Sequence, residues 1–337
     1  MLWKFSKKFQ FAADKIIPDS FVFCIILTLI VFVLGLVLTG TGPLDLVNSW
    51  YGGLWSMIAF AFQMSFMVIC CGAAAKSPQI ERLLKKIAAL PKSSGIAMII
   101  LLVFGLVSSL INWAFSLILT PILAMQLSKN VKGLHFPLMI AAGYSTMILG
   151  QCWCPSASAY ALLATEGHFM QDVLGVLSQN LTTYNPVNTT LFFILAFATI
   201  LIGVLTKPPK NEIVTYECDV NDINEEIAVS EIKEKDTIAD KMNNNRFLML
   251  ILGIAGLVVI GYSIATKGII KSLNFNFVIF LFLILNTFLY NTPKKFVTAF
   301  RDSMKPATQV MMQFPFYGGI MGIMSGSGLT SIMANAL

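Results

Sequence analysis

Apolar runs long enough to cross a membrane recur along the whole chain. The hydrocarbon core of a bilayer requires about 20 consecutive apolar residues per helix. Of all residues, 56% are hydrophobic and 12% are charged, whereas soluble domains carry roughly twice that charged share. The sequence therefore predicts an all-α polytopic membrane protein. Spanning segments are expected at 21–39, 52–75, 137–163, 189–206, 247–266, 272–290 and 306–326.

Two parts of the chain match each other at a fixed offset of 250 residues. The run 21–39 falls on 271–289, and the segment 63–67 falls on 313–317. The charges that flank the two copies are reversed. The hinge after the first run holds no Lys or Arg, whereas its counterpart is basic. The basic residues after the second run are Lys294, Lys295 and Arg301.

Reversed flanking charge predicts that the two copies cross the membrane in opposite directions, because positive loops stay on the cytoplasmic side. Two copies of opposite topology are typical of a secondary transporter, which holds its substrate between them near the midplane. The competing interpretation is a chance similarity between helices rich in Phe, Met and Gly. The reversed charges favour the inverted repeat.

The distribution of charge also predicts the topology. Lysines before the first run place the N-terminus in the cytoplasm, and that run is too long for a cleaved signal peptide. The loop 164–188 holds no Lys or Arg and is expected outside, whereas 207–246 is a polar cytoplasmic linker. Lys267 and Lys271 alone oppose this scheme. The net charge of +6 is therefore a topology signal, and no nucleic-acid partner is expected.

Two of the apolar segments have an interruption. The segment 95–128 would form about 51 Å of continuous helix, too long for one crossing of about 30 Å. A re-entrant hairpin with its tip near 108–112 and both ends cytoplasmic fits its length and its charges. A long tilted helix is the alternative. The segment 137–163 is interrupted around Pro155, which predicts a broken helix.

These segments give a predicted division of the chain into three parts. Residues 1–206 form a first transmembrane repeat, 207–246 the charged linker, and 247–337 a linking helix with the start of a second, inverted repeat. Within the first repeat, 79–90 has apolar residues at helical spacing, with its charges on the opposite face. Such a helix is expected to lie flat in the cytoplasmic interface.

No Asp, Glu, Lys, Arg or His lies centrally in any predicted membrane segment. A binding site must then use hydroxyls, amides and the free N–H groups of half-helix N-termini, which suit an anion. Unwound backbone is tolerated at membrane depth only where protein or a water-filled cavity covers it. The two breaks therefore predict the site. The candidate substrate-binding residues are Ser108, Ser109, Asn112, Ser116, Gln151, Ser156 and Gln313.

Each candidate has a structural alternative. A lone Ser or Thr in a membrane helix often donates to its own helix, so Asn112 is the strongest candidate because an amide is costly in lipid. Gln63 and Gln313 are repeat equivalents that could line the interface between the copies. Cys152 and Cys154 without a nearby His are weak evidence for a metal site, and none is expected. The membrane segments lack the acid–base pair that an enzyme requires, so no enzymatic activity is expected.

Four short motifs stand out: the opening 18–21, the stretch 111–115, the run Gln-Phe-Pro-Phe-Tyr-Gly-Gly-Ile at 313–320, and 327–329. They resemble motifs of the bacterial short-chain fatty acid transporter family, the acetoacetate and butyrate permeases. The resemblance extends along essentially the whole chain. It implies a multi-pass carrier of small monocarboxylates in the bacterial cytoplasmic membrane, related in architecture to inverted-repeat anion transporters.

The sequence departs from that family in two places. The second break, 150–155, is bulkier than the Gly-rich break of family members, which bears on the identity of the substrate. The chain ends about where the second copy would begin its own hairpin, so the second repeat is expected to be incomplete. A truncated, non-transporting remnant or subunit is therefore the alternative function. No cofactor is expected, and the sequence does not choose between Na⁺ and H⁺ coupling or decide whether the protein forms an oligomer.

Overall fold

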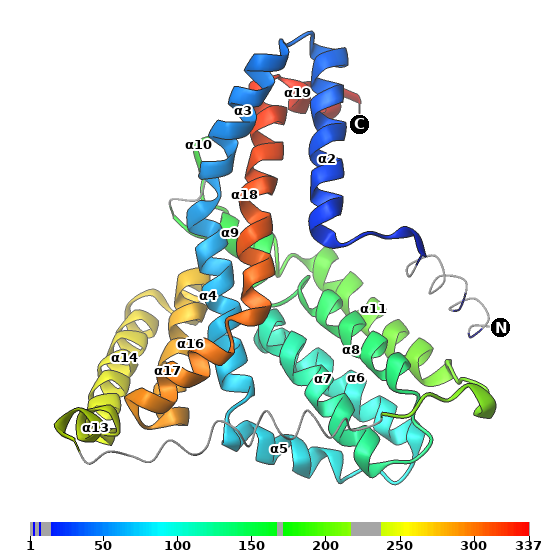
Figure 1. Cartoon of the computed structure of the whole chain (residues 1–337), viewed down its shortest axis with the longest axis vertical. Helices are drawn as coiled ribbons and strands as arrows, with labels where there is room; N and C mark the ends of the chain where they lie inside the picture. The colour runs from blue at the N-terminus through cyan, green and yellow to red at the C-terminus, as the bar shows by residue number, and fades with distance from the viewer. Residues whose placement is uncertain (1–2, 4–6, 8–14, 167–170, 217–236, 337) are drawn as a thin grey trace. The chain divides into compact units, whose positions relative to one another are not determined.

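The computed structural model describes residues 3, 7, 15–166, 171–216 and 237–336 (Figure 1). Every regular element among these residues is a helix. Five helical stretches within them are long and apolar enough to cross a membrane. The protein is thus an all-α, multi-pass membrane protein, which confirms the predicted fold class. The five stretches are Ser20–Thr39, Ile58–Ala75, Ser94–Ile111, Pro186–Leu205 and Ile238–Lys267.

The chain folds into two compact units. Unit 1 combines the N-terminal segment 1–69 with the C-terminal segment 304–337, and unit 2 is formed by 70–303. This division follows contacts in space, whereas the predicted division at 206 and 246 follows the sequence repeat. The predicted division stays a prediction.

Unit 1 is built from helices whose ends have clear local causes. The Asp19 carboxylate accepts from the backbone N–H of Phe21 at 2.8 Å and caps α2. Gly40 has a φ of 67°, a conformation that favours glycine, and the chain turns there. Pro43 then begins the next helix. The helices are α2 (Ser20–Leu34), its π-helical extension η1 (Gly35–Thr39), α3 (Pro43–Ser56), most of α4 (Ile58–Ala75), α18 (Lys305–Gly326) and α19 (Leu329–Ala336).

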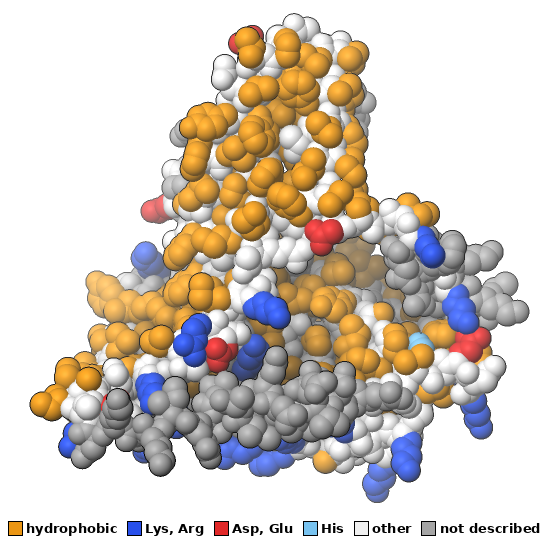
Figure 2. All heavy atoms as spheres, viewed as in Figure 1, with side chains coloured by type: hydrophobic (Ala, Val, Ile, Leu, Met, Phe, Trp, Pro, Cys, Tyr) orange, Lys and Arg blue, Asp and Glu red, His pale blue; other side chains and the backbone are white. Residues whose placement is uncertain are grey.

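Glycines bring α3 and α18 into close backbone contact. A methyl group added to Gly53 would lie 2.8 Å from Cα of Gly322, well inside van der Waals distance. Close approach of this kind is how membrane helices associate, since lipid tails remove the hydrophobic drive between them. Hydrophobic side chains cover the outer surface of α2, α3 and α18, as suits contact with lipid (Figure 2).

Unit 2 contains a bundle of α6, α7, α8 and α11, and a separate pair of α14 and α16. Five of these helices begin with a side-chain cap, for example from Ser93 on α6 and from Asn185 on α11. The helices are α5 (Pro78–Ala88), α6 (Ser94–Ile111), α7 (Trp113–Asn130), α8 (Phe136–Gly150), α9 (Ser158–Leu163), α10 (Gln171–Leu174), α11 (Pro186–Leu205), η2 (Lys210–Glu212), α13 (Ile238–Asn243), α14 (Arg246–Lys267), α15 (Ile269–Ser272), α16 (Phe275–Tyr290) and α17 (Pro293–Asp302).

Several helix ends of unit 2 meet beside α5. The amide Nδ2 of Asn130, at the end of α7, donates to the carbonyl of Ala88 at 3.0 Å. At the other end of α5, Nε2 of Gln79 donates to the carbonyl of Leu289, near the end of α16, at 3.0 Å. Lys and Arg side chains gather along this edge (Figure 2). The helix ends that meet beside α5 are called the basic end below. Their content of Lys and Arg is that expected of the cytoplasmic side.

The segment after α11 also returns to the basic end. The backbone N–H of Val214 donates to Nδ1 of His135 at 2.9 Å, and Val214 accepts from the N–H of Phe136 at 2.8 Å. Burial lowers the pKa of His135, and the nearby Glu212 partly opposes that shift. A neutral imidazole can accept from Val214, so this contact favours the same protonation state as burial does.

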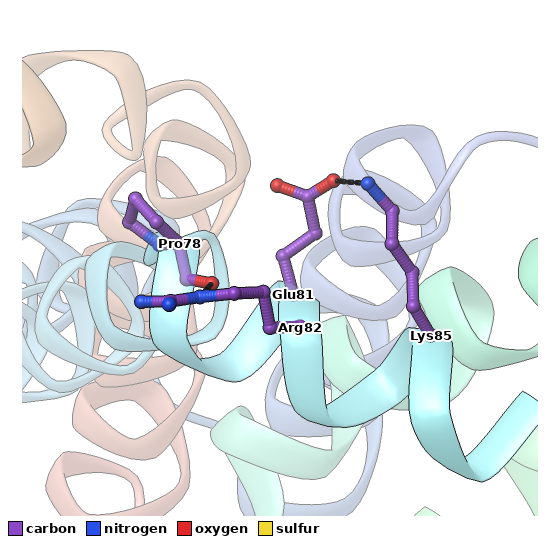
Figure 3. Close-up of polar contacts among 4 residues, drawn as sticks. All are labelled: Pro78, Glu81, Arg82 and Lys85. Carbon is purple, nitrogen blue, oxygen red and sulfur yellow. Dashed lines mark hydrogen bonds and ion pairs between the residues drawn. The ribbon is translucent and has the colours of Figure 1, made fainter.

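Helix α5 is amphipathic, as the segment 79–90 predicted. Leu84 and Ala88 are buried, while Lys85 and Glu81 are exposed and form an ion pair of 2.5 Å (Figure 3). In the same view, Nε of Arg82 donates to the carbonyl of Pro78 at 3.1 Å. A helix with one apolar face and one charged face is suited to lying along a membrane surface.

One predicted helix is divided in the structure, and the segment predicted to be a hairpin consists of two helices. The segment 52–75 was expected to be one helix, but α3 begins earlier, at Pro43, and the helix breaks at Met57 before α4. The segment 95–128 consists of α6 and α7, which pack against each other and meet at Asn112.

Candidate functional site

Asn112 forms the first break. Its backbone is extended, with φ −163° and ψ 132°, between the end of α6 and the start of α7. Its side-chain oxygen accepts from the N–H of Ala114 at 2.8 Å and of Phe115 at 3.1 Å. The first N–H groups of a helix have no partner within the helix, so this cap allows the chain to turn inside the protein. Asn112 is completely buried.

The serines near this break have different partners. Ser108 of α6 donates to Oγ of Ser116 of α7 at 3.0 Å, and this bond joins the two arms of the hairpin. Ser116 in turn lies 3.1 Å from the carbonyl of Gly105 and 3.2 Å from Oγ1 of Thr120. Ser109 donates to the carbonyl of Leu106 in its own helix at 2.7 Å. The alternative of a hydroxyl that bonds only to its own helix therefore describes Ser109. Oγ of Ser108 also lies 3.1 Å from the carbonyl of Gly105 in its own helix, so that alternative describes Ser108 in part.

The second break lies against the first. Helix α8 ends at Gly150, and the chain turns irregularly until α9 begins at Ser158. Within this segment, Oγ of Ser156 accepts from Nδ2 of Asn112 at 2.8 Å. Both side chains are fully buried. Two breaks that are 44 residues apart in the chain are thus joined by one hydrogen bond.

Two cysteine thiols complete the surroundings of this bond. Cys71, in the last turn of α4, donates to Oδ1 of Asn112 at 3.3 Å. Sγ of Cys154 lies 3.5 Å from Oγ of Ser156. Asn112 is therefore held from three sides, by α4, by its own helix and by the second break.

Small residues let α6, α7 and α8 approach closely enough for these bonds. A methyl group on Gly143 of α8 would lie 2.6 Å from Cγ2 of Thr120 of α7. A methyl group on Gly105 or Gly150 would overlap Thr146 or Ser109 respectively. The contacts among the Ser and Thr hydroxyls of α6, α7 and α8 thus depend on glycines that lie opposite these side chains.

Two candidates lie outside this cluster. Gln151 caps the end of α8, and its side chain is partly exposed. Gln313 belongs to α18 of unit 1, where its Nε2 donates to Oγ of Ser20 at 2.6 Å and its Oε1 accepts from Tyr317. The structure therefore brings together Ser108, Asn112, Ser116 and Ser156.

The structure adds two residues that the sequence argument did not select. Trp113 is 6% exposed, and its indole N–H is buried without a hydrogen-bond partner. Asn286 of α16 is completely buried. Its Nδ2 donates to the carbonyls of Cys70 and Phe282 at 2.8 Å each, and its Oδ1 has no partner. An amide within an apolar run was the signal used for Asn112, and the same signal identifies Asn286.

The cluster offers neutral donors and acceptors at a helix N-terminus. Unpartnered buried groups are uncommon, and each costs about 1–3 kcal/mol. Such groups are therefore good candidates for contact with a ligand. Among the described residues, no group of three or more His, Cys, Asp or Glu could hold a metal ion.

Comparison with known proteins gives one family. A provisionally named short-chain fatty acid transporter of Haemophilus influenzae is 28% identical over 342 residues, which cover 99% of this chain and 75% of that protein. A provisionally named short-chain fatty acid transporter of Escherichia coli strain K12 is 27% identical over 336 residues, with the same two coverages. No solved structure matches the chain. The profile of the short chain fatty acid transporter family matches residues 1–337, so the chain belongs to that family.

Proposed function

We propose that the protein is a secondary transporter that carries short-chain fatty acids, such as acetoacetate or butyrate, across the bacterial cytoplasmic membrane. Membership of the family supports this class of substrate. The observation that carries the proposal further is the bond between Asn112 and Ser156, which joins two helix breaks in an apolar bundle. Broken helices at membrane depth are where secondary transporters bind their substrates.

The chemistry of this site suits a carboxylate. The N-terminus of α7 carries partial positive charge, and its N–H groups at Ala114 and Phe115 already face one neutral oxygen, that of Asn112. A substrate carboxylate that displaces this oxygen would bind the same two N–H groups. The indole N–H of Trp113, at the first position of α7, is a third donor without a partner. Neutral donors bind an anion less tightly than a positively charged side chain does, so they release it more easily.

Alternating access would come from two copies of opposite topology. Four consecutive elements support the repeat at the offset of 250 residues. Subtracting 250 moves α16 (275–290) to 25–40, beside α2 and η1 at 20–39, and moves the first residue of α17 from 293 to 43, where α3 begins. The same subtraction moves α18 to 55–76, beside α4 at 58–75, and α19 to 79–86, within α5 at 78–88.

Uptake of labelled butyrate and acetoacetate tests the proposal. The purified chain is reconstituted into liposomes, and initial rates are measured against substrate concentration. Saturable uptake that unlabelled short-chain acids compete away is expected, while a long-chain acid or a neutral amide of the same length should not compete. Uptake no greater than in protein-free liposomes would contradict the proposal. The same assay with an imposed Na⁺ gradient or pH gradient identifies the coupling ion.

A further inference from the structure

A cavity of about 1000 Å³ opens in unit 2 between the loop that follows α9 and the turn that joins α14 to α16. Its described lining combines polar and apolar residues and includes the charged residues Lys267, Lys271 and Glu166. The volume lies at the upper limit for sites that enclose a drug-sized ligand. A four-carbon acid would fill only a small part of it. The cavity is therefore too large for a tight binding site and has the size of a vestibule.

The vestibule lies at the end of unit 2 away from the basic end. Helix α14 runs from Arg246 to Lys267, and α16 returns from Phe275 towards Leu289, whose carbonyl contacts α5 at the basic end. If the basic end is cytoplasmic, the vestibule faces outside. Lys267 and Lys271 are the two lysines that contradict the predicted topology, because external loops are normally poor in Lys. A role in the vestibule explains why they stand there.

Gln179 connects the vestibule with the substrate site. It lines the cavity and is 4% exposed. Its Nε2 donates to the carbonyl of Pro155 at 2.9 Å and to the carbonyl of Leu273 at 2.7 Å, while its buried Oε1 has no partner. Pro155 directly precedes Ser156, which binds Asn112. The wall of the vestibule is thus bonded to the second helix break.

We propose that this cavity is an external vestibule in which Lys267 and Lys271 concentrate the carboxylate anion before it enters the site at Asn112. The inference rests on the proposed function, because it assumes that an anionic substrate enters here. Fatty acids with a carboxyl pKa near that of Glu are anions at neutral pH. Clefts lined by one sign of charge raise the local concentration and the association rate of an oppositely charged ligand. The negative charge of Glu166 opposes that of the two lysines and should weaken the attraction of the substrate anion.

The test measures initial uptake rates at low ionic strength in oriented vesicles. Lys267→Gln with Lys271→Gln should raise KM about threefold to tenfold and leave kcat unchanged, because only capture is impaired. Lys267→Arg with Lys271→Arg keeps the charge and should keep the wild-type KM. Glu166→Gln removes the opposing charge and should lower KM. In 0.5 M salt, where screening shortens electrostatic range to a few ångströms, these differences should largely disappear.

Lys132→Gln with Lys207→Gln is the matched control, since it removes the same charge from two exposed positions outside the vestibule. Its KM should equal that of the wild type. If the Lys267 and Lys271 double variant matches this control, or if Glu166→Gln raises KM, the vestibule proposal is overturned while the transporter proposal stands. If the wild type shows no saturable uptake, the transporter proposal itself has failed. An unchanged kcat and a wild-type KM in 0.5 M salt show that an impaired double variant has not simply misfolded.

Discussion

At the first residue of α7, Trp113 holds a buried indole N–H without a partner. We expect Trp113→Phe to raise the KM for butyrate about ten- to a hundredfold, because a hydrogen bond to a charged group contributes roughly 1.5–3 kcal/mol. The unfolding temperature should change little. Removal of an unsatisfied donor, worth about 1–3 kcal/mol, offsets the packing lost with the larger ring. Uptake kinetics and thermal unfolding of the purified protein check both expectations.

Trp153→Phe is the control for that variant. The indole N–H of Trp153 already donates to Oγ1 of Thr189 at 2.9 Å, and its ring stacks on Phe192. This substitution should lower the unfolding temperature and leave KM unchanged, the opposite pattern to Trp113→Phe. An unchanged KM in Trp113→Phe would remove the indole N–H from the proposed site.

Asn112 can be tested without loss of its capping role. Asn112→Asp keeps the oxygens that accept from Ala114 and Phe115, so the hairpin should still fold. It removes the donor to Ser156 and places a negative charge where the substrate carboxylate is proposed to bind. We expect KM to rise ten- to a hundredfold, the equivalent of about 1.5–3 kcal/mol. Ser145→Ala, which removes only a bond within α8, should leave KM unchanged, and wild-type kinetics in Asn112→Asp would contradict the proposed anion position.

Single residues also show what the sequence could predict. Asn112 was identifiable because a strong hydrogen-bonding group in an apolar run requires partners. Its contacts with Cys71 and Ser156 were not, because they join segments far apart in the chain. The same holds for Trp113, since its missing partner is a property of the packed bundle and not of the local sequence. Whether Ser108, Ser109, Asn112, Ser116, Gln151, Ser156 and Gln313 bind substrate stays a prediction.

At the scale of elements, length was the most informative property. The apolar segment 95–128 was too long for one crossing, and the structure divides it at Asn112 into two helices of 18 residues. Each is about 27 Å long at 1.5 Å per residue, so the tip can lie deep in the hydrocarbon. The break at Met57 was less predictable. Gly53 lies inside α3, where its role is the close approach of α18, and no Pro or polar cluster marks the break itself.

The hairpin predicts that both of its ends label from the cytoplasm. Lys92→Cys and Lys132→Cys place exposed thiols before α6 and after α7, in a background from which Cys152 and Cys218 have been removed. A membrane-impermeant maleimide should label both positions only in inside-out vesicles. Val187→Cys, at the start of α11, is the comparison position and should label only from the opposite side. Labelling of positions 92 and 132 from opposite sides would show that 95–128 crosses the membrane once.

At the scale of the whole molecule, the opposed repeats predict an odd number of membrane crossings between equivalent positions of the two copies. Lys85 of α5 and Asn335 of α19 are exposed and stand 250 residues apart, at equivalent positions of the two copies. Between them the proposed crossings are α8 with α9, α11, α14, α16 and α18, while the hairpin returns to the side from which it started. An odd number of crossings places the two positions on opposite sides of the membrane, as an inverted repeat requires.

Lys85→Cys and Asn335→Cys, each as the single cysteine reactive towards the impermeant reagent, test this parity. We expect Lys85→Cys to label in inside-out vesicles and Asn335→Cys in right-side-out vesicles, because the lysines around α5 hold that end in the cytoplasm. Labelling of both positions from one side would indicate parallel copies or a single crossing by 95–128. Retained labelling of Lys92→Cys and Lys132→Cys from one side would then exclude the single crossing. That result would leave copies of the same topology, which have no inverted partner for alternating access.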